Sequence, residues 1–203
     1  MEDVNDQTIK TYRDNFIKYA EKTPKEVNGE FKIWMDSFLS FVPKNGTIFE
    51  IGSATGRDAS YFHLQRYKVF CTDVLPEELQ KLSKKGFETA EFDFRDNPKQ
   101  EWNNRFDGFF ANAVLLHATQ DVFKKTLINI SSILKKRGVI AFSLKAGEGE
   151  EMLSIKMGSP RYFKYYTIEE IKEMLKELPY KIINISCADD GKWIHVIAQK
   201  TDS

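Results

Sequence analysis

The sequence predicts a doubly wound α/β domain: a mainly parallel, seven-stranded sheet with helices on both faces and an antiparallel strand pair at the C-terminal end. Three observations support this expectation. Short apolar runs alternate with helical patterns from about residue 47 onward. A glycine-containing turn follows the first apolar run, and two further runs close the chain on either side of Asp189-Asp190-Gly191.

Seven segments have the features of strands because they are short, apolar and bounded by turn residues. The fourth segment is nearly continuous in apolar residues, as buried parallel strands are. We expect the last two to pair with each other in antiparallel fashion. The expected strands are 47–51, 69–72, 87–92, 106–111, 138–144, 181–186 and 193–199.

Six segments have the spacing of apolar residues that is typical of helices. Pro76 suits a first helical turn, and Thr167 with Glu170 has the spacing of a capping box. We expect residues 1–45 to form a helical lid over the ligand site, and residues 46–203 to form one compact unit. The expected helices are 7–21, 30–41, 57–67, 76–85, 122–134 and 167–178.

Length and charge restrict the class of protein. A chain of 203 residues suits one domain with a full core. Lys plus Arg and Asp plus Glu both number 30, and this zero net charge argues against a nucleic-acid partner. The basic run Lys135-Lys136-Arg137 is interpreted as a helix C-terminus, where cations complement the helix dipole, and less readily as an RNA-binding patch.

The cysteines and the N-terminus bear on the cellular compartment. Cys71 and Cys187 form no C-x-x-C pair, so no zinc site or other metal site is expected. We interpret them as buried reduced thiols, and a single disulfide between them is the alternative. The acidic start Met1-Glu2-Asp3 lacks the features of a signal peptide, and the longest apolar stretch, 108–116, is too short to span a membrane. We therefore expect a cytoplasmic monomer or homodimer with no membrane partner.

The ligand is expected outside the carboxyl ends of the strands, where open α/β sheets bind their ligands. Gly52 and Gly56 follow the first strand and allow the backbone to turn sharply and approach a ligand closely. Asp73 ends the second strand, 21 residues after Gly52, and a carboxylate at this offset can accept both hydroxyl protons of a ribose. The dinucleotide fingerprint G-x-G-x-x-G fails at Ala54 and Arg57, which makes a dehydrogenase a weak alternative.

The E-x-G-x-x-x-G spacing of Glu50, Gly52 and Gly56 resembles the first motif of class I S-adenosylmethionine-dependent methyltransferases, usually E/D-x-G-x-G-x-G. Ala54 departs from that pattern, and its methyl group is tolerated only at an ordinary backbone angle. Residues 8–200 are similar to the small bacterial methyltransferases described as type 11, type 12 or tellurite-resistance-like. The segments that carry this resemblance are Ile51-Gly52-Ser53-Ala54-Thr55-Gly56-Arg57-Asp58, Phe106-Asp107-Gly108, Ala113-Val114-Leu115-Leu116-His117, Ser143-Leu144-Lys145-Ala146-Gly147-Glu148-Gly149-Glu150, Arg161-Tyr162-Phe163 and Trp193-Ile194-His195-Val196-Ile197.

The resemblance implies a Rossmann-like fold, S-adenosylmethionine as cofactor, and in-line methyl transfer to a small-molecule acceptor. It implies that Asp58 caps a helix or binds the cofactor's ammonium group, and that Asp93 accepts the adenine amino group or is a loop acid. Tyr12 and Tyr19, seven residues apart on one helix face, would cover the cofactor or simply pack. The expected cofactor-binding residues are Tyr19, Glu50, Gly52, Ser53, Ala54, Gly56, Arg57, Asp58, Asp73, Val74, Asp93, Phe94, Asn112, Ala113 and His117.

His117 is the candidate catalytic residue. It follows the fourth strand, and its ordinary pKa near neutrality suits a general base, although a packing or capping role is the alternative. The segment from Asn112 to His117 lacks the N/D-P-P-Y/F tetrapeptide of nucleic-acid and glutamine N-methyltransferases. That absence argues against an exocyclic amine or amide as the acceptor.

The connection 145–166 is expected to be a long irregular loop that binds the acceptor. Lys145, Arg161 and Tyr165 are the candidate substrate-binding residues, with Arg161 gripping a carboxylate or phosphate. The alternative is that Arg161 pairs internally with Glu148 or Glu150. Two other functions stay open: a methyltransferase acting on RNA or protein, and a cofactor-binding protein without catalysis.

Overall fold

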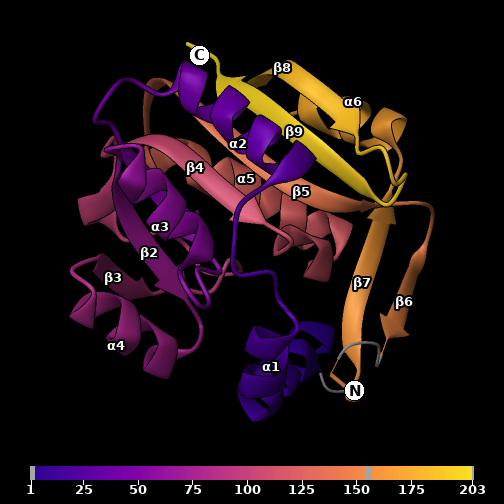
Figure 1. The fold of residues 1–203 in the computed structure, drawn as a ribbon. Coiled ribbons are helices and arrows are strands. Elements are labelled where there is room, and N and C mark those ends of the chain that lie inside the picture. The colour runs from indigo at the N-terminus through magenta and orange to yellow at the C-terminus, as the bar shows by residue number, and fades with distance from the viewer. Residues whose placement is uncertain (1–2, 154–156, 203) are drawn as a thin grey trace.

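A mixed sheet runs through the molecule and carries helices on both faces (Figure 1). The computed structural model describes residues 3–153 and 157–202, so Met1 and Glu2 of the expected leaderless N-terminus lie outside it. The described strands are β1 (Thr47–Ile51), β2 (Lys68–Asp73), β3 (Glu88–Glu91), β4 (Phe106–Asn112), β5 (Leu134–Ala146), β6 (Glu150–Leu153), β7 (Arg161–Tyr166), β8 (Tyr180–Cys187) and β9 (Trp193–Lys200). The described helices are α1 (Val4–Glu21), α2 (Gly29–Phe41), α3 (Arg57–Leu64), α4 (Pro76–Lys84), α5 (Gln120–Ile133) and α6 (Ile168–Lys176), with short 3-10 helices η1 (Gln100–Trp102) and η2 (Leu115–His117).

The strand order confirms the expected fold class. Strands β3, β2, β1, β4 and β5 are parallel neighbours in that order, and β9 then pairs antiparallel with β5 and with β8. The expected C-terminal pair is therefore β8 and β9. The capping box at the start of α6 is also confirmed, because the Thr167 side chain accepts from the Glu170 amide while the Glu170 side chain accepts from the Thr167 amide.

The described sheet has nine strands, two more than expected, because β6 and β7 form within the connection that we expected to be irregular. They pair with each other antiparallel, and β7 continues the sheet where β4 ends: Asn112 pairs with Ser143, and beyond it Lys145 pairs with Tyr165. The run Arg161–Tyr166 lacks an alternation of polar and apolar residues, so a period of two was not visible in it. In the structure, β5 and β6 pair with its two edges, and α1 and η2 pack beside it.

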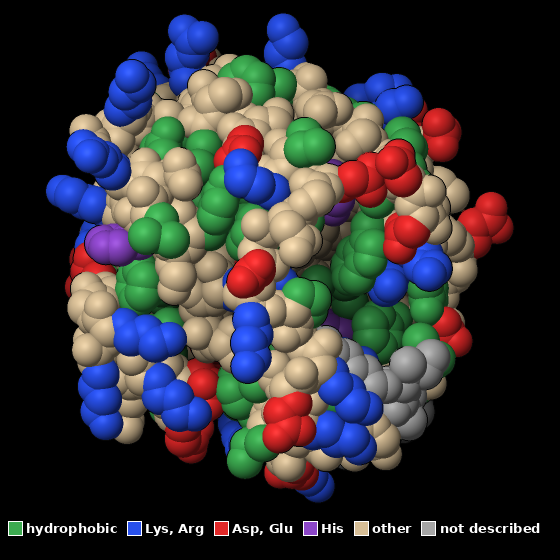
Figure 2. Space-filling view, viewed as in Figure 1, with side chains coloured by type: hydrophobic (Ala, Val, Ile, Leu, Met, Phe, Trp, Pro, Cys, Tyr) green, Lys and Arg blue, Asp and Glu red, His purple; other side chains and the backbone are tan. Residues whose placement is uncertain are grey.

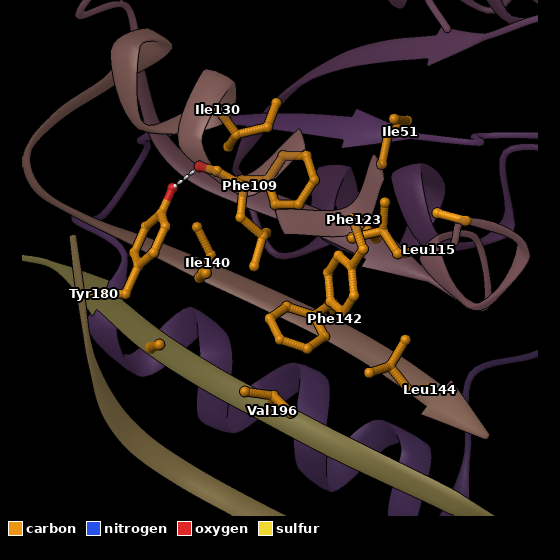
Figure 3. Close-up of a cluster of buried hydrophobic side chains, with 14 of the residues drawn as sticks. Ile51, Phe109, Leu115, Phe123, Ile130, Ile140, Phe142, Leu144, Tyr180 and Val196 are labelled. Carbon is orange, nitrogen blue, oxygen red and sulfur yellow. Dashed lines mark hydrogen bonds between the residues drawn. The ribbon is translucent and has the colours of Figure 1, made fainter. Parts of the chain in front are cut away.

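Two apolar clusters hold the helices to the sheet. On one face, α5 and α6 bury Phe123, Leu127 and Ile171 against Phe109 and Phe142 of the strands, as Figure 3 shows in part. Tyr180 closes this layer by donating its hydroxyl hydrogen bond to the Leu127 carbonyl at 2.7 Å, the dashed line of Figure 3. On the other face, α2 and α3 pack onto β1, β4 and β5 through Trp34, Phe38, Phe62 and Phe110.

The two N-terminal helices, both expected in a lid, have different places. Trp34, Met35, Phe38 and Leu39 are buried in the second apolar cluster, so α2 is part of the domain core. By contrast, the side chains that α1 buries are Asn5, Thr8 and Thr11, all polar, and α1 lies beyond the strands and beside β7 (Figure 1). Of the two helices, α1 is therefore the one that lies outside the apolar core of the domain.

Two smaller expectations meet different outcomes. Cys71 is buried, whereas Cys187 is exposed near the end of the outermost strand β8, so the interpretation of both as buried thiols was wrong for Cys187. Both thiols are free. Among the described residues, no helix is long and apolar enough to cross a membrane.

Candidate functional site

A pocket opens where β1, β2 and β4 end, and α1 covers it. It encloses about 740 Å³ of space free of protein atoms, part of it open to solvent. The pocket is lined by Asn5, Thr8, Ile9, Tyr12, Phe16, Tyr19, Ile51, Gly52, Ala54, Asp73, Val74, Leu75, Phe92, Phe94, Asn112, Ala113, Val114 and His117.

The turn after β1 is shaped for close approach. Gly52 and Gly56 both have left-handed backbone angles, with φ of 67° and 78°. A Cβ atom on Gly52 would lie 2.5 Å from Val114 Cγ2, and one on Gly56 would lie 2.3 Å from Leu82 Cδ2. Both glycines are therefore required by space as well as by conformation.

Ala54 has a left-handed angle as well, with φ of 46°, so the ordinary angle that its methyl group requires is not present. Ala113 shares this feature, with φ of 56°, and both alanines line the pocket. Left-handed backbone costs an L-residue about 1–2 kcal/mol, and such strain concentrates at functional sites.

Asp73 lies at the end of β2 and lines the pocket, with 6% of its surface exposed. Its Oδ2 accepts from the Ala54 amide at 2.8 Å, and its Oδ1 accepts from the Leu75 amide at 3.0 Å. Burial raises the pKa of this carboxyl, while the backbone amides act in the opposite direction. Each carboxylate oxygen keeps a second lone pair, so the group can still accept hydroxyl donors from a ligand.

Glu50 and Ser53 flank the turn from inside the protein and do not line the pocket. Glu50 Oε2 and Ser53 Oγ are buried and have no hydrogen-bond partner within the described ranges. Burial, together with the nearby Asp58 charge, raises the pKa of Glu50. Unsatisfied polar atoms at this depth are uncommon in proteins, and two of them lie beside this one turn.

Arg57 and Asp58 support the pocket from behind its wall. Arg57 Nε donates to Asp58 Oδ1 at 2.5 Å, and Asn112 Nδ2 donates to Asp58 Oδ2 at 2.9 Å. Asn112 Oδ1 in turn accepts from Ser143 Oγ, which itself accepts from the Ala113 amide. This network links α3 to β4 and β5. Of its members, only Asn112 and Ala113 line the pocket.

Asp93 is held by an arginine and does not line the pocket, although its neighbours Phe92 and Phe94 do. Its Oδ2 accepts from Arg95 Nη2 at 2.7 Å. Arg95 Nη1 lies 2.8 Å from Asp6 Oδ1 on α1. Through Arg95, the carboxylate that we expected at the adenine links the loop after β3 to the start of α1.

Aromatic side chains of α1 form the outer wall. Tyr12 and Tyr19 meet edge to face with ring centroids 5.2 Å apart, and Phe16 lies 5.9 Å from Tyr19. The sequence analysis missed Phe16 and the rest of this helix face. Their spacing of three and four residues was the signal that could have found them, since such positions share one face. The missed lining residues are Asn5, Thr8, Ile9, Phe16, Ile51, Leu75, Phe92 and Val114.

His117 is buried, and both of its ring nitrogens have hydrogen-bond partners. Nδ1 lies 2.6 Å from the Tyr162 carbonyl oxygen, which can only accept, so Nδ1 is the donor. Nε2 lies 3.0 Å from Tyr12 Oη, and neutral imidazole accepts there. Burial lowers the pKa of His117 to about 3, and the nearby Arg161 charge acts in the same direction. The ring is therefore neutral at physiological pH.

The three expected substrate residues lie outside the pocket lining, and two of them, Lys145 and Tyr165, are paired in the sheet. Arg161 is buried in β7 and donates from Nη1 to Tyr12 Oη at 2.9 Å. Lys145 Nζ lies 4.0 Å from the centre of the Trp193 ring, and Tyr165 donates to Glu151 Oε1 at 2.5 Å. The bond that holds Arg161 to α1 differs from the pairing with Glu148 or Glu150 that we considered as an alternative.

The site contains few groups for acid–base chemistry. The ionisable residues lining the pocket are Tyr12, Tyr19, Asp73 and His117. Among the described residues, no group of three or more His, Cys, Asp or Glu side chains could hold a metal ion. The narrow glycine turn, the acceptor carboxylate of Asp73 and the aromatic walls instead suit a nucleoside with a polar extension, as in a nucleotide-like cofactor.

Comparison with known proteins places the chain in a family. A family model described as "Methyltransferase domain" matches residues 25–185. A search of curated proteins finds no match.

Three solved structures share the fold. The Burkholderia thailandensis 1,6-didemethyltoxoflavin-N1-methyltransferase, solved with 1,6-didemethyltoxoflavin and S-adenosylhomocysteine, is 18% identical and has a TM-score of 0.76, over 98% of this chain and 88% of the other. A SAM-dependent methyltransferase from Methanosarcina mazei is 13% identical with a TM-score of 0.69, over 80% and 96%. The [4+2]-cyclase SpnF is 12% identical with a TM-score of 0.67, over 85% and 82%.

Proposed function

This chain belongs to the family of methyltransferase domains, and on that premise we propose that it transfers a methyl group from S-adenosylmethionine to a small-molecule acceptor. The observation that carries the proposal is the position of Asp73 beside the strained Gly52–Ala54 turn, inside a pocket that the aromatic face of α1 covers. A carboxylate at the end of the second strand suits a ribose. The aromatic side chains suit a sulfonium cation.

Different residues of the pocket contact different parts of the cofactor. Asp73 binds the ribose hydroxyls, while Leu75, Phe92 and Phe94 give the adenine an apolar surface. Gly52 and Ala54 let the backbone approach the methionyl part, and Asn112 presents its amide at the same wall. In this assignment Glu50, Ser53, Arg57 and Asp58 shape the turn from behind, and Asp93 positions the loop that carries the two phenylalanines.

S-adenosylmethionine supplies a methyl group that is already activated by its sulfonium centre, and the acceptor takes it by in-line displacement. The protein's part is to align the two molecules and to exclude water. His117 is a weak base here, because its Nε2 lone pair is engaged by Tyr12 and its pKa is low. The acceptor therefore brings its attacking lone pair into the site without help from this histidine.

We place the acceptor next to His117, along β7. Arg161, Phe163 and Tyr165 alternate on one side of this strand, and the Phe163 ring lies 4.8 Å from the His117 ring. Lys145 pairs with Tyr165 on one side and with Trp193 on the other. Figure 2, drawn from the side of α2, shows hydrophobic side chains gathered in a hollow over β7. Aromatic surface with one ammonium group at its edge favours a flat acceptor that bears an anionic group.

Calorimetry with S-adenosylhomocysteine tests the cofactor. We expect micromolar-range affinity, on the order of −8 kcal/mol, and no binding of NAD. Binding of NAD alone would contradict the proposal. The acceptor class is tested by release of S-adenosylhomocysteine in the presence of metabolite fractions, with Lys145→Met expected to raise KM for an anionic acceptor while cofactor affinity is unchanged.

A reaction other than methyl transfer is the second candidate. The fold is shared with SpnF, a [4+2]-cyclase, so the fold by itself does not establish the chemistry.

The acceptor has an alternative as well. Labelled methyl groups that enter acid-insoluble material would indicate RNA or protein as the acceptor. Cofactor binding without turnover of any fraction would indicate a protein without methyltransferase activity. The type 11 or type 12 grouping, the cytoplasmic location and the monomeric or homodimeric state stay predictions.

A further inference from the structure

We propose that Arg161 and His117 are positioning residues that act through Tyr12, holding α1 closed over the cofactor pocket. The proposal rests on the proposed function only in naming the cofactor. Tyr12 is the sole member of this trio on α1, and it lies between the other two: its Oη is 2.9 Å from Arg161 Nη1 and 3.0 Å from His117 Nε2.

The hydrogen bonds run in series from the Tyr162 carbonyl through His117 and Tyr12 to Arg161. The direction of each bond follows from the groups at the two ends of this series. The Tyr162 carbonyl has no proton, so His117 Nδ1 must donate to it and His117 Nε2 must accept. A guanidinium has no acceptor, so Arg161 must donate to Tyr12 Oη. The Tyr12 hydroxyl hydrogen therefore has one direction left, toward His117 Nε2. Each member satisfies the next, and one orientation of the Tyr12 ring is selected.

Ring contacts around these hydrogen bonds favour the same orientation of the Tyr12 side chain. The Arg161 guanidinium lies 5.3 Å from the centre of the Tyr12 ring and 4.9 Å from that of Phe163. The Tyr12 ring also meets the His117 ring at 5.5 Å, nearly edge to face. Arg161 is 6% exposed, so its contacts with these rings are shielded from solvent.

These hydrogen bonds join three elements that are distant from one another in the sequence. Tyr12 belongs to α1, His117 to η2 after β4, and Arg161 to β7, which lies between β5 and β6 in the sheet. Neighbouring bonds support the same junction: Thr8 Oγ1 accepts from the Tyr162 amide at 3.0 Å, and Asn5 Nδ2 donates to the His117 carbonyl. Because α1 buries polar side chains, these directional bonds set its position more than apolar packing does.

Nitrogen NMR of the imidazole side chains tests the proposal without any ligand. We expect His117 to carry its proton on Nδ1 and to accept a hydrogen bond at Nε2, with its signals assigned by their loss in His117→Gln. Tyr12→Phe should move the Nε2 resonance toward that of a free acceptor. Arg161→Met should move the same resonance in the same direction, because the guanidinium holds the Tyr12 hydroxyl that donates to His117, and Arg161→Lys should restore much of the shift.

Cofactor-product binding gives the second readout. Tyr12→Phe and Arg161→Met should weaken S-adenosylhomocysteine binding about tenfold and speed its dissociation, as loss of one buried hydrogen bond in the closed state implies. Arg13→Met, on the exposed side of the same helix, and Tyr61→Phe, whose hydroxyl bonds Asp36 at the surface, are the matched controls and should change neither readout.

Two results would overturn the proposal: an unchanged His117 resonance in Arg161→Met, or the imidazole proton on Nε2 in the parent protein. If the parent fails to bind S-adenosylhomocysteine, the proposed function fails. The nitrogen spectrum still decides in that case whether Arg161 holds Tyr12 on His117.

Discussion

The carboxylate of Asp73 and the amide of Ala54 form a hydrogen bond of 2.8 Å that joins the end of β2 to the turn after β1. Through this bond, a carboxylate that lines the pocket also holds the left-handed backbone at Ala54, with φ of 46°. Ligand binding and turn geometry are therefore coupled at one side chain.

Asp73→Ala should weaken S-adenosylhomocysteine binding at least tenfold, because it removes a ligand acceptor and leaves the Ala54 and Leu75 amides without their partner. Asp93→Ala is the control and should have a smaller effect, since its carboxylate is held by Arg95 outside the pocket lining. Calorimetry measures both. Equal affinities for Asp73→Ala and the parent would remove Asp73 from the site.

Ala54→Gly should stabilise the protein by roughly 0.5–1 kcal/mol. Relief of left-handed strain, about 1–2 kcal/mol, exceeds the added chain entropy of glycine, about 0.5–1 kcal/mol. The measurement is the urea midpoint at unchanged m-value. Ala59→Gly, a buried position inside α3, is the matched control and should lower the midpoint. A lower midpoint for Ala54→Gly would mean that the alanine is not strained.

Gly52→Ala should destabilise the protein more than Gly86→Ala does. Both glycines have positive φ, 67° and 93°, so the backbone strain of the two alanines is similar. A Cβ at Gly52 would lie 2.5 Å from Val114 Cγ2, whereas nothing lies within 4 Å of one at Gly86. Valine is stiff at χ1, so the overlap adds about 1–3 kcal/mol. Because Val114 lines the pocket, only Gly52→Ala should also weaken cofactor-product binding. Equal losses of stability would contradict this steric account.

His117 should make folding stability dependent on pH. Its pKa is lowered by burial from 6.5 to about 3, so below pH 6.5 the unfolded chain binds a proton that the folded protein does not. Stability from this residue is thus present above pH 6.5 and is lost as pH falls toward 3, by up to about 1.4 kcal/mol per pH unit.

The measurement for this prediction is the difference in unfolding free energy between the parent and His117→Gln from pH 6.5 to 4.5. Glu50, whose pKa is raised by burial, contributes with the opposite sign, but it is common to both proteins and cancels in the difference. A difference that does not change with pH would show that His117 takes up its proton at the same pH in the folded protein as in the unfolded chain.

Much of the fold was readable from local patterns. Apolar runs with flanking turns located β1, β2 and β4, because buried parallel strands need apolar residues on both faces. The spacing of Gly52, Gly56 and Asp73 located the ligand end of the sheet, because the strand ends and the turn are set by the adjacent residues themselves. The capping box of α6 was visible for the same reason: Thr167 and Glu170 are three residues apart.

Partners distant in the chain were decided only by the tertiary structure. Arg161 donates to Tyr12, which is 149 residues away in the chain, and Asp93 accepts from Arg95. No periodicity in the run Arg161–Tyr166 marks it as a strand.

The physical reason is common to these cases. The amino-acid sequence by itself determined which segments are helices or strands and which turn can approach a ligand, since these depend on backbone preferences and on neighbours within a few residues. The geometry of β7 and the neutral state of His117 depend on burial against α1. That burial exists only after segments far apart in the sequence have packed together.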